Sequence, residues 1–93
     1  MAQELVFSVH ALRRMSERRI AVEDVEGALS GGEVVEDYPD DQPYPSRLML
    51  GWSGSRPIHV VIAENAPDNE TVVVTAYEPE PGQWDASFRR RTE

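Results

Sequence analysis

The feature that most constrains the fold is a change of hydrophobic period at the Gly31–Gly32 pair. Before this pair, apolar residues recur every three or four positions, which is the spacing of one face of a helix. After it they tend to alternate with polar residues, as on a strand with one buried face. The first part therefore predicts two helices, at residues 9–19 and 22–30. The second part predicts four strands, at residues 33–38, 47–52, 58–64 and 72–77, and a further short strand is expected near the start, at 5–7.

Two helices followed by successive strands indicate an α+β domain, with the helices packed on a four-stranded antiparallel meander. Residues 1–93 are expected to form a single domain, since a chain of this length supplies one hydrophobic core.

Alternation in the last two strands assigns side chains to the two faces of the sheet. The face expected toward the helices is purely apolar and comprises Ile58, Val60, Ile62, Val72, Val74 and Ala76. The opposite face is a candidate site, because it gathers an imidazole, a hydroxyl and a phenol from His59, Thr75 and Tyr77, beside Val61, Ala63 and Val73.

Several classes of protein are disfavoured by what the sequence lacks. There is no cysteine, so disulfides, thiolate metal sites and cysteine nucleophiles are absent. The two histidines lie far apart in the chain and the clustered Asp37, Asp40 and Asp41 are ordinary loop residues, so neither a metal site nor a cofactor is expected. No apolar stretch has the length of a membrane span, and the first residues do not resemble a secretory signal. We therefore expect a cytoplasmic protein that does not bind a membrane.

Charge is distributed unevenly along a chain whose net charge is −8. All nine basic residues are arginine, and four of them lie at positions 13–19 beside His10. Residues 21–46 hold eight acidic residues and no basic one, and three arginines follow at 89–91. A guanidinium binds phosphate through paired hydrogen bonds, so the first helix is a candidate anion-binding wall. The alternatives are that the arginine preference reflects base composition and that the helix merely presents a solvated face with local ion pairs.

Four stretches together resemble the bacterial domain of unknown function 4258 family: "FSVHALRRMSERRI", "GEVVEDYPDDQPYPS", "RPIHVVIA" and "TAYEPEPGQW…FRRR". That family is similar to compact toxin ribonucleases of the RelE and barnase-like superfamily, which often form toxin–antitoxin pairs. The resemblance implies a RelE/barnase-like toxin fold, a metal-independent ribonuclease activity on RNA and an antitoxin protein as partner. Its motif residues carry over to His10, Arg14, Arg18, His59, Thr75, Tyr77 and Glu78. The chain departs from the family at Ala21, where a Ser or Thr would cap the second helix.

RNA cleavage without a metal needs a base near the 2′-hydroxyl, an acid near the 5′-oxygen and donors for the charged phosphorane. In the hypothesis that follows, His10 and His59 share the base and acid roles, because imidazole titrates near neutral pH. Thr75 and Tyr77 lie beside His59, and Tyr77 donates a proton or stacks on a base. The phosphate is held by arginines that should converge on one cleft: Arg14, Arg18, Arg89 and Arg90.

Each of these residues also has a purely structural interpretation. His59 could be a half-buried strand residue with one hydrogen bond, and residues 89–91 could bind the acidic part of the same chain. Trp84 and Phe88 are expected to fill the core rather than to stack on a nucleotide. Nucleic-acid-binding domains are normally basic, so the acidic total favours a competing class. That class is a non-catalytic protein-interaction module, a decayed toxin that binds its partner through the acidic segment 23–41.

Overall fold

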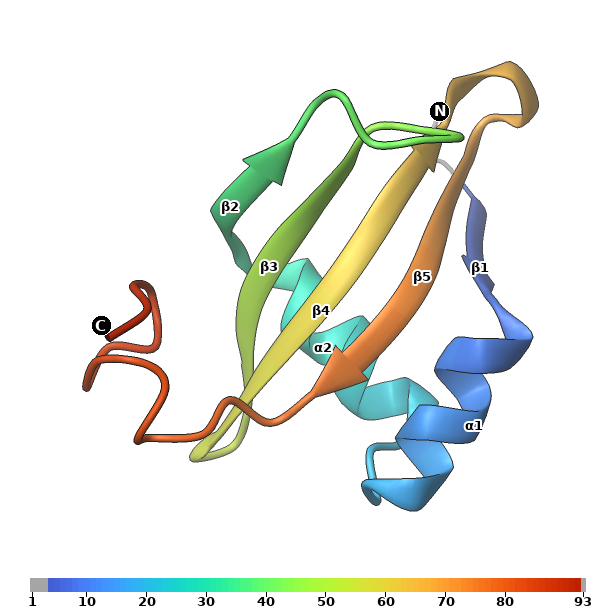
Figure 1. Cartoon of the computed structure of the whole chain (residues 1–93). Coiled ribbons are helices and arrows are strands. Elements are labelled where there is room, and N and C mark those ends of the chain that lie inside the picture. Colours follow the sequence, from blue (N-terminus) through green and yellow to red (C-terminus); the bar gives the residue numbers. More distant parts are fainter. Residues whose placement is uncertain (1–3, 93) are drawn as a thin grey trace.

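The computed structural model describes residues 4–92 and contains two helices and a five-stranded sheet (Figure 1). The helices are α1 (Val9–Glu17) and α2 (Val22–Ser30). The strands are β1 (Glu4–Phe7), β2 (Glu33–Tyr38), β3 (Ser46–Ser53), β4 (Arg56–Asn65) and β5 (Glu70–Tyr77), with a 3₁₀ turn η1 (Ala66–Asp68) before β5. The elements predicted from hydrophobic period are thus present, and their ends shift by at most two residues.

The sheet has the order β1-β5-β4-β3-β2. Strands β2 to β5 pair antiparallel with their chain neighbours, but β1 pairs in parallel with β5, from Glu4 opposite Glu70 to Phe7 opposite Val73. The prediction of a four-stranded antiparallel meander of the RelE/barnase-like type is therefore wrong, although the class remains α+β. The physical reason is that the second edge of β5 still needs hydrogen-bond partners. The segment before α1 lies beside that edge, and the Ser8 N–H extends the pairing to the Val73 carbonyl at 3.2 Å.

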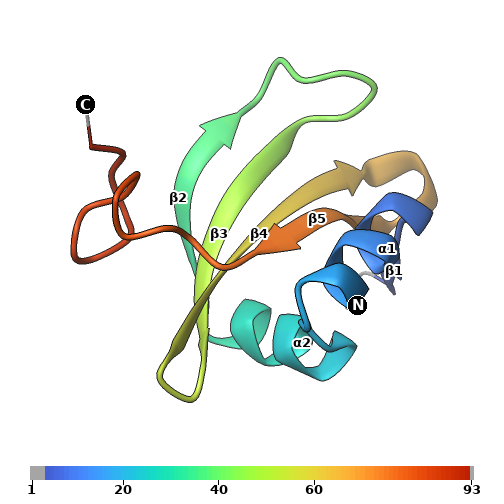
Figure 2. The same cartoon turned by 60° about the horizontal axis from the view of Figure 1, so that its bottom comes forward.

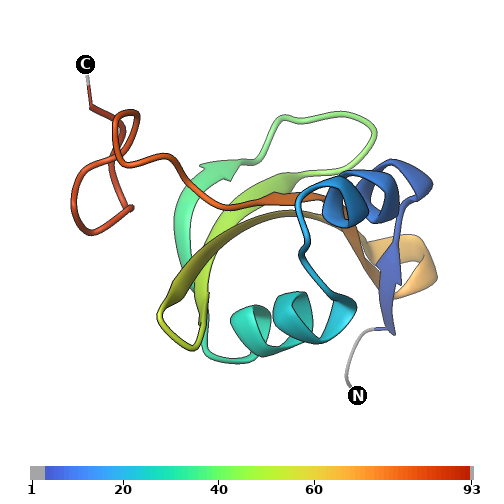
Figure 3. The ribbon, with the colours of Figure 1, turned by 90° about the horizontal axis from the view of Figure 1, so that it is seen from below.

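Both helices cover one face of the sheet, which we call the helix face (Figure 3). Its core contains only apolar side chains: Ala11, Met15, Ile20, Val25, Ala28, Ile58, Val60, Ile62, Val73 and Ala76. Helix α2 approaches β3 so closely that a Cβ built on Gly51 would lie 2.5 Å from the Ala28 Cα. The missing cap at Ala21 is offset by Asp24, whose carboxylate accepts the Ala21 N–H at 2.9 Å and the Ser53 hydroxyl at 2.8 Å.

A β-bulge in β5 changes which residues face the helices. Val61 pairs with Thr75 and Ile62 with Val73, so Val74 is the extra residue between them. Val73 is consequently buried on the helix face, while Val74 is exposed. The predicted assignment of Val72 and Val74 to the helix face is therefore wrong. Because the bulge precedes Thr75, the strand end keeps the predicted orientation, with Thr75 and Tyr77 on the side of His59.

The other face of the sheet, which we call the tail face, is not open. After β5, residues 79–92 (the C-terminal segment) cross β4 and β3 toward β2 (Figure 2). The large buried side chains on this side come from the strands and from the C-terminal segment: Leu48, Leu50, His59 and Trp84. Trp84 fills a core, as predicted, but this core is a second one on the opposite side from the helices.

Candidate functional site

A polar pocket of about 360 Å³ lies where α1 and β5 end. Its lining comes from three parts of the chain that are distant in sequence: Arg18, Arg56, and the stretch that holds Tyr77, Glu78, Glu80 and Gln83. The pocket brings together Arg18 and Tyr77 from the predicted site, along with Glu78 from the family motif. Arg56, Glu80 and Gln83 were not predicted.

Arg18 reaches the pocket because of the way α1 ends. Arg19 adopts a left-handed conformation with φ of 56°, and the Ile20 N–H donates to the Met15 carbonyl at 2.9 Å. Ile20 is then buried, which completes the hydrophobic contact typical of such a helix end. The Arg18 guanidinium is left beside the end of β5, where it donates to the Ala76 carbonyl at 3.0 Å and to Thr75 Oγ1 at 3.5 Å. Thr75 thus adjoins the pocket through Arg18.

Arg56, at the start of β4, fixes the geometry around Arg18. Its Nη1 donates to the Arg19 carbonyl at 2.9 Å and its Nη2 to the Arg18 carbonyl at 3.0 Å. Its Nε pairs with Glu78 Oε1 at 2.7 Å. A cation is favoured at the carbonyl end of a helix, so Arg56 both caps α1 and holds Glu78 at the pocket. The one signal for Arg56 in the sequence is a lone arginine in the turn before a strand, which does not indicate the helix end that the side chain reaches.

Behind Tyr77 lies His59, which is completely buried. His59 Nε2 lies 2.8 Å from the Phe88 carbonyl, which can only accept, so Nε2 carries the proton. His59 Nδ1 is then free to accept from the Tyr77 hydroxyl at 3.4 Å. The Trp84 ring packs edge-to-face on the imidazole, with the ring centroids 4.4 Å apart. The three groups form a chain from the Phe88 carbonyl through His59 to the Tyr77 hydroxyl.

Burial sets the protonation of this chain. It lowers the pKa of His59, and the favourable Phe88 carbonyl and Glu36 charge act in the opposite direction. It also raises the pKa of Tyr77. Both groups are therefore neutral near pH 7, with Tyr77 as the member that lines the pocket. His59 does lie on the same side of the sheet as Thr75 and Tyr77, as predicted, but it cannot contact a ligand directly because its face is covered.

The structure does not bring the two histidines together. His10 is exposed at the start of α1, whereas Arg18 lies just past its end. Eight residues of helix separate His10 from Arg18 by roughly 12 Å along the axis. Arg14 points away from the pocket to an ion pair with Glu17 at 3.2 Å. His59 is buried beneath the C-terminal segment whereas His10 is exposed near the start of α1, so the two side chains are not presented to a common site.

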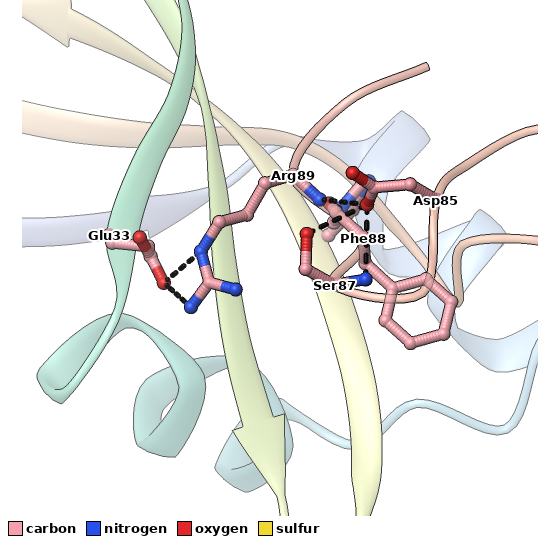
Figure 4. A network of polar contacts seen from close by, with 6 residues as sticks. Glu33, Asp85, Ser87, Phe88 and Arg89 are labelled. Atoms are coloured by element: carbon pink, nitrogen blue, oxygen red, sulfur yellow. Dashed lines mark hydrogen bonds and ion pairs between the residues drawn. The ribbon is translucent and has the colours of Figure 1, made fainter. Parts of the chain in front are cut away.

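The arginines of the C-terminal segment do not join Arg18 either. Arg89 donates to Glu33 Oε1 from Nη2 at 2.6 Å and from Nε at 3.0 Å (Figure 4). Arg91 pairs with Glu36 at 3.5 Å, and Arg90 is exposed. Both paired carboxylates belong to β2. Two of the three arginines at 89–91 thus bind the acidic part of the same chain, which was the alternative interpretation.

Within residues 4–92, no group of three or more histidine or acidic side chains is arranged to hold a metal ion. No helix in that part of the chain is long and apolar enough to cross a membrane. The chemistry available in the pocket is therefore that of two guanidinium groups, a phenol and carboxylates, with an imidazole behind the phenol.

Comparison with known proteins gives one match. The family model described as domain of unknown function (DUF4258) matches residues 7–78, from the end of β1 to the residue after β5. No curated protein and no solved structure matches the chain. The matched region contains Arg18, Arg56, His59, Tyr77 and Glu78 and stops before the C-terminal segment. Since it covers well over half of the 93 residues, the chain belongs to the DUF4258 family.

Proposed function

We propose that this protein is a metal-independent ribonuclease of the toxin–antitoxin type, and that RNA is cleaved in the polar pocket. The observation that supports this most is the convergence of Arg18, Tyr77 and Glu78 in a single pocket. A guanidinium, a neutral hydroxyl and a carboxylate are the groups that phosphodiester cleavage by a neighbouring hydroxyl requires. An antitoxin would then be the partner that controls the activity.

The pocket suggests a division of roles that differs from the two-histidine hypothesis. Arg18 binds the scissile phosphate and stabilises the charge that develops on it. A carboxylate of Glu78 or Glu80 takes the proton of the 2′-hydroxyl as the 2′-oxygen attacks phosphorus. The Tyr77 hydroxyl turns from His59 Nδ1 to the 5′-oxygen, and the bond from phosphorus to that oxygen breaks as it takes the phenol proton, so the product is a 2′,3′-cyclic phosphate. His59 acts through Tyr77 as a positioning residue, and His10 has no role.

The test is cleavage of a labelled single-stranded RNA in excess chelator, with detection of the cyclic phosphate. Tyr77→Phe keeps the ring and should lower the rate by about two to four orders of magnitude. Arg18→Gln should lower it by roughly two to three orders of magnitude. Arg13→Gln removes the same charge from an exposed position of the same helix and should leave the rate unchanged, as should His10→Gln. Absence of cleavage by the wild-type protein, or full activity of Arg18→Gln, would overturn the proposal.

One observation favours the second candidate, a protein-interaction module. The acidic segment 23–41 already binds arginine within the chain, through Glu33 and Glu36. Asp37 and Asp40 of the same segment are exposed. This candidate predicts binding of an octa-arginine peptide that weakens in an Asp37→Asn, Asp40→Asn variant, together with intact RNA. The ribonuclease proposal predicts cleavage that the same variant does not alter.

A further inference from the structure

The C-terminal segment is attached to the rest of the protein in an unusual way. Within the described residues, each backbone–backbone hydrogen bond made by residues 79–92 has both partners inside the segment, as in Asp85 to Arg90 and Thr92 to Gln83. Its one short bridge, between Trp84 and Arg91, is also internal. In the described part of the chain, the segment therefore adds no hydrogen bonds to the sheet ladder. It can separate from the sheet without breaking any strand pairing.

The segment is nevertheless ordered within itself. Asp85 Oδ1 accepts the Ser87 N–H at 3.0 Å, the Ser87 hydroxyl at 2.7 Å and the Arg89 N–H at 3.3 Å (Figure 4). Phe88 takes a left-handed φ of 60°, which is unusual for an aromatic residue and which aims its carbonyl at His59. Such an internally bonded loop moves as a unit rather than residue by residue.

Two surface ion pairs fasten this unit to β2. In the Arg89–Glu33 pair, both side chains are about half exposed. In the Arg91–Glu36 pair, the arginine is 58% exposed, and its guanidinium also lies 4.7 Å from the centre of the Trp84 ring. Ion pairs in contact with water are weak and are screened by salt. The fastening is therefore sensitive to ionic conditions.

The same unit conceals His59. Trp84 covers one side of the imidazole and the Phe88 carbonyl occupies Nε2. The Phe88 ring also packs edge-to-face against Trp52, which is otherwise 46% exposed. Removing the segment would expose His59 Nε2 and Trp52 on one side of the sheet, next to Tyr77.

We propose that residues 79–92 are a reversible cover, which packs on the sheet through Trp84 and is fastened at its end by the Arg89–Glu33 and Arg91–Glu36 ion pairs, and that its release opens a second site at His59 on the tail face. In the closed state His59 only positions Tyr77. In the open state its Nε2 becomes an accessible donor or acceptor between two aromatic rings. The proposal concerns access to His59, and it holds whether or not the protein cleaves RNA.

The experiment is modification of the full-length protein by diethylpyrocarbonate at neutral pH, with the adducts on His10 and His59 quantified separately by mass spectrometry. The chain has two histidines, so exposed His10 serves as the internal reference. In the wild-type protein at low salt, His10 should react and His59 should be protected. In the double variant Arg89→Gln, Arg91→Gln, the rate of His59 modification should rise roughly three- to tenfold, because two exposed ion pairs are lost.

Matched variants separate the cover from a general charge effect. Arg90→Gln removes the same charge from the position between the two paired arginines and should leave the His59 rate at the wild-type value. Glu33→Gln removes the acidic partner of Arg89 and should therefore raise the rate of His59 modification. The exchange Arg89→Glu with Glu33→Arg should restore protection. Added sodium chloride should accelerate His59 modification in the wild-type protein more than in Arg89→Gln, Arg91→Gln.

Backbone amide exchange in β4 and β5 distinguishes release of the cover from unfolding. The proposal requires that these amides stay protected in Arg89→Gln, Arg91→Gln while His59 becomes reactive. It is overturned if His59 stays protected in that variant. It is equally overturned if His59 reactivity and amide exchange in β4 rise together, since the segment would then be an inseparable part of the fold.

Discussion

The two faces of the sheet are covered in different ways. The helix face is closed by α1 and α2, whose apolar side chains meet those of β4 and β5 with no charged group among the buried residues. The tail face is closed by a segment without helix or strand, through an imidazole, aromatic rings and surface ion pairs. Apolar packing of this kind carries no charge that can be screened or titrated, whereas the ion pairs of the tail face are screened by salt and its imidazole can gain a proton. One face therefore maintains the fold, and the other is suited to change.

The largest expected effect is on the helix face, at the contact between α2 and β3. Gly51→Ala places a Cβ 2.5 Å from the Ala28 Cα, and neither backbone can move without displacing its neighbours. We expect a loss of at least about 3 kcal/mol in the free energy of unfolding, or failure to fold. Chemical denaturation followed by circular dichroism measures it. The control is Gly27→Ala in α2, where nothing lies within 4 Å of the added Cβ and a gain of up to about 1 kcal/mol is expected. Equal behaviour of the two variants would contradict the tight helix face.

Replacing one buried side chain on each face by alanine tests whether the two cores unfold together or separately. Ile58→Ala on the helix face should cost about 2 to 4 kcal/mol, because Ile58 is fully buried in a core that cannot detach. Trp84 is larger, yet Trp84→Ala should cost less than about 2 kcal/mol, since the segment can separate and the cost is then limited to its own attachment. Denaturation monitored by circular dichroism measures both. If Trp84→Ala were the more damaging change, the tail face would be part of the main core.

The smallest effect is a dependence of stability on pH between 7.5 and 5.5 that arises from His59 on the tail face. Burial lowers the pKa of His59 below its unfolded value of about 6.5, so the unfolded chain binds this proton more readily. The contribution of His59 to stability is therefore complete above about pH 6.5 and falls as the pH drops toward the lowered folded pKa. Each unit of lowering corresponds to about 1.4 kcal/mol. Between pH 7.5 and 5.5, His59→Gln should show a shallower loss of stability than the wild-type protein, while His10→Gln should follow the wild type. Parallel curves for all three proteins would contradict burial of a neutral His59.

The sequence was sufficient for the elements but not for every pairing. Residues 9–30 and 33–77 carry periods long enough to reveal helices and strands, and the two predicted helix starts are confirmed. Two other features leave no such mark. Four residues of β1 are too few to show which edge they join. In the run Val72–Val74 every position is apolar, so a bulge does not disturb the visible pattern.

The candidate site was predictable in part for the same reason. Thr75 and Tyr77 lie on the same side as His59 because both follow the bulge in β5, and alternation holds over that short stretch. Arg18 was predicted from its helix row, but its contact with the end of β5 depends on how α1 terminates at Arg19. The cover over His59 and the pairing of Arg89 with Glu33 join positions more than 25 residues apart through irregular chain, where no period exists to read.

The parallel pair of β1 and β5 has a consequence for the order of events during synthesis. Residue 4 lies opposite residue 70, so the first strand finds its partner only when nearly the whole chain exists. Strands β2 to β5 can meanwhile zip up through short turns, because neighbouring hairpins close small loops at little entropic cost. On the ribosome, β1 and α1 must therefore wait, with the apolar side of α1 unprotected, until β5 has left the exit tunnel. The first of the five strands to be made is therefore paired only after the last of them has formed.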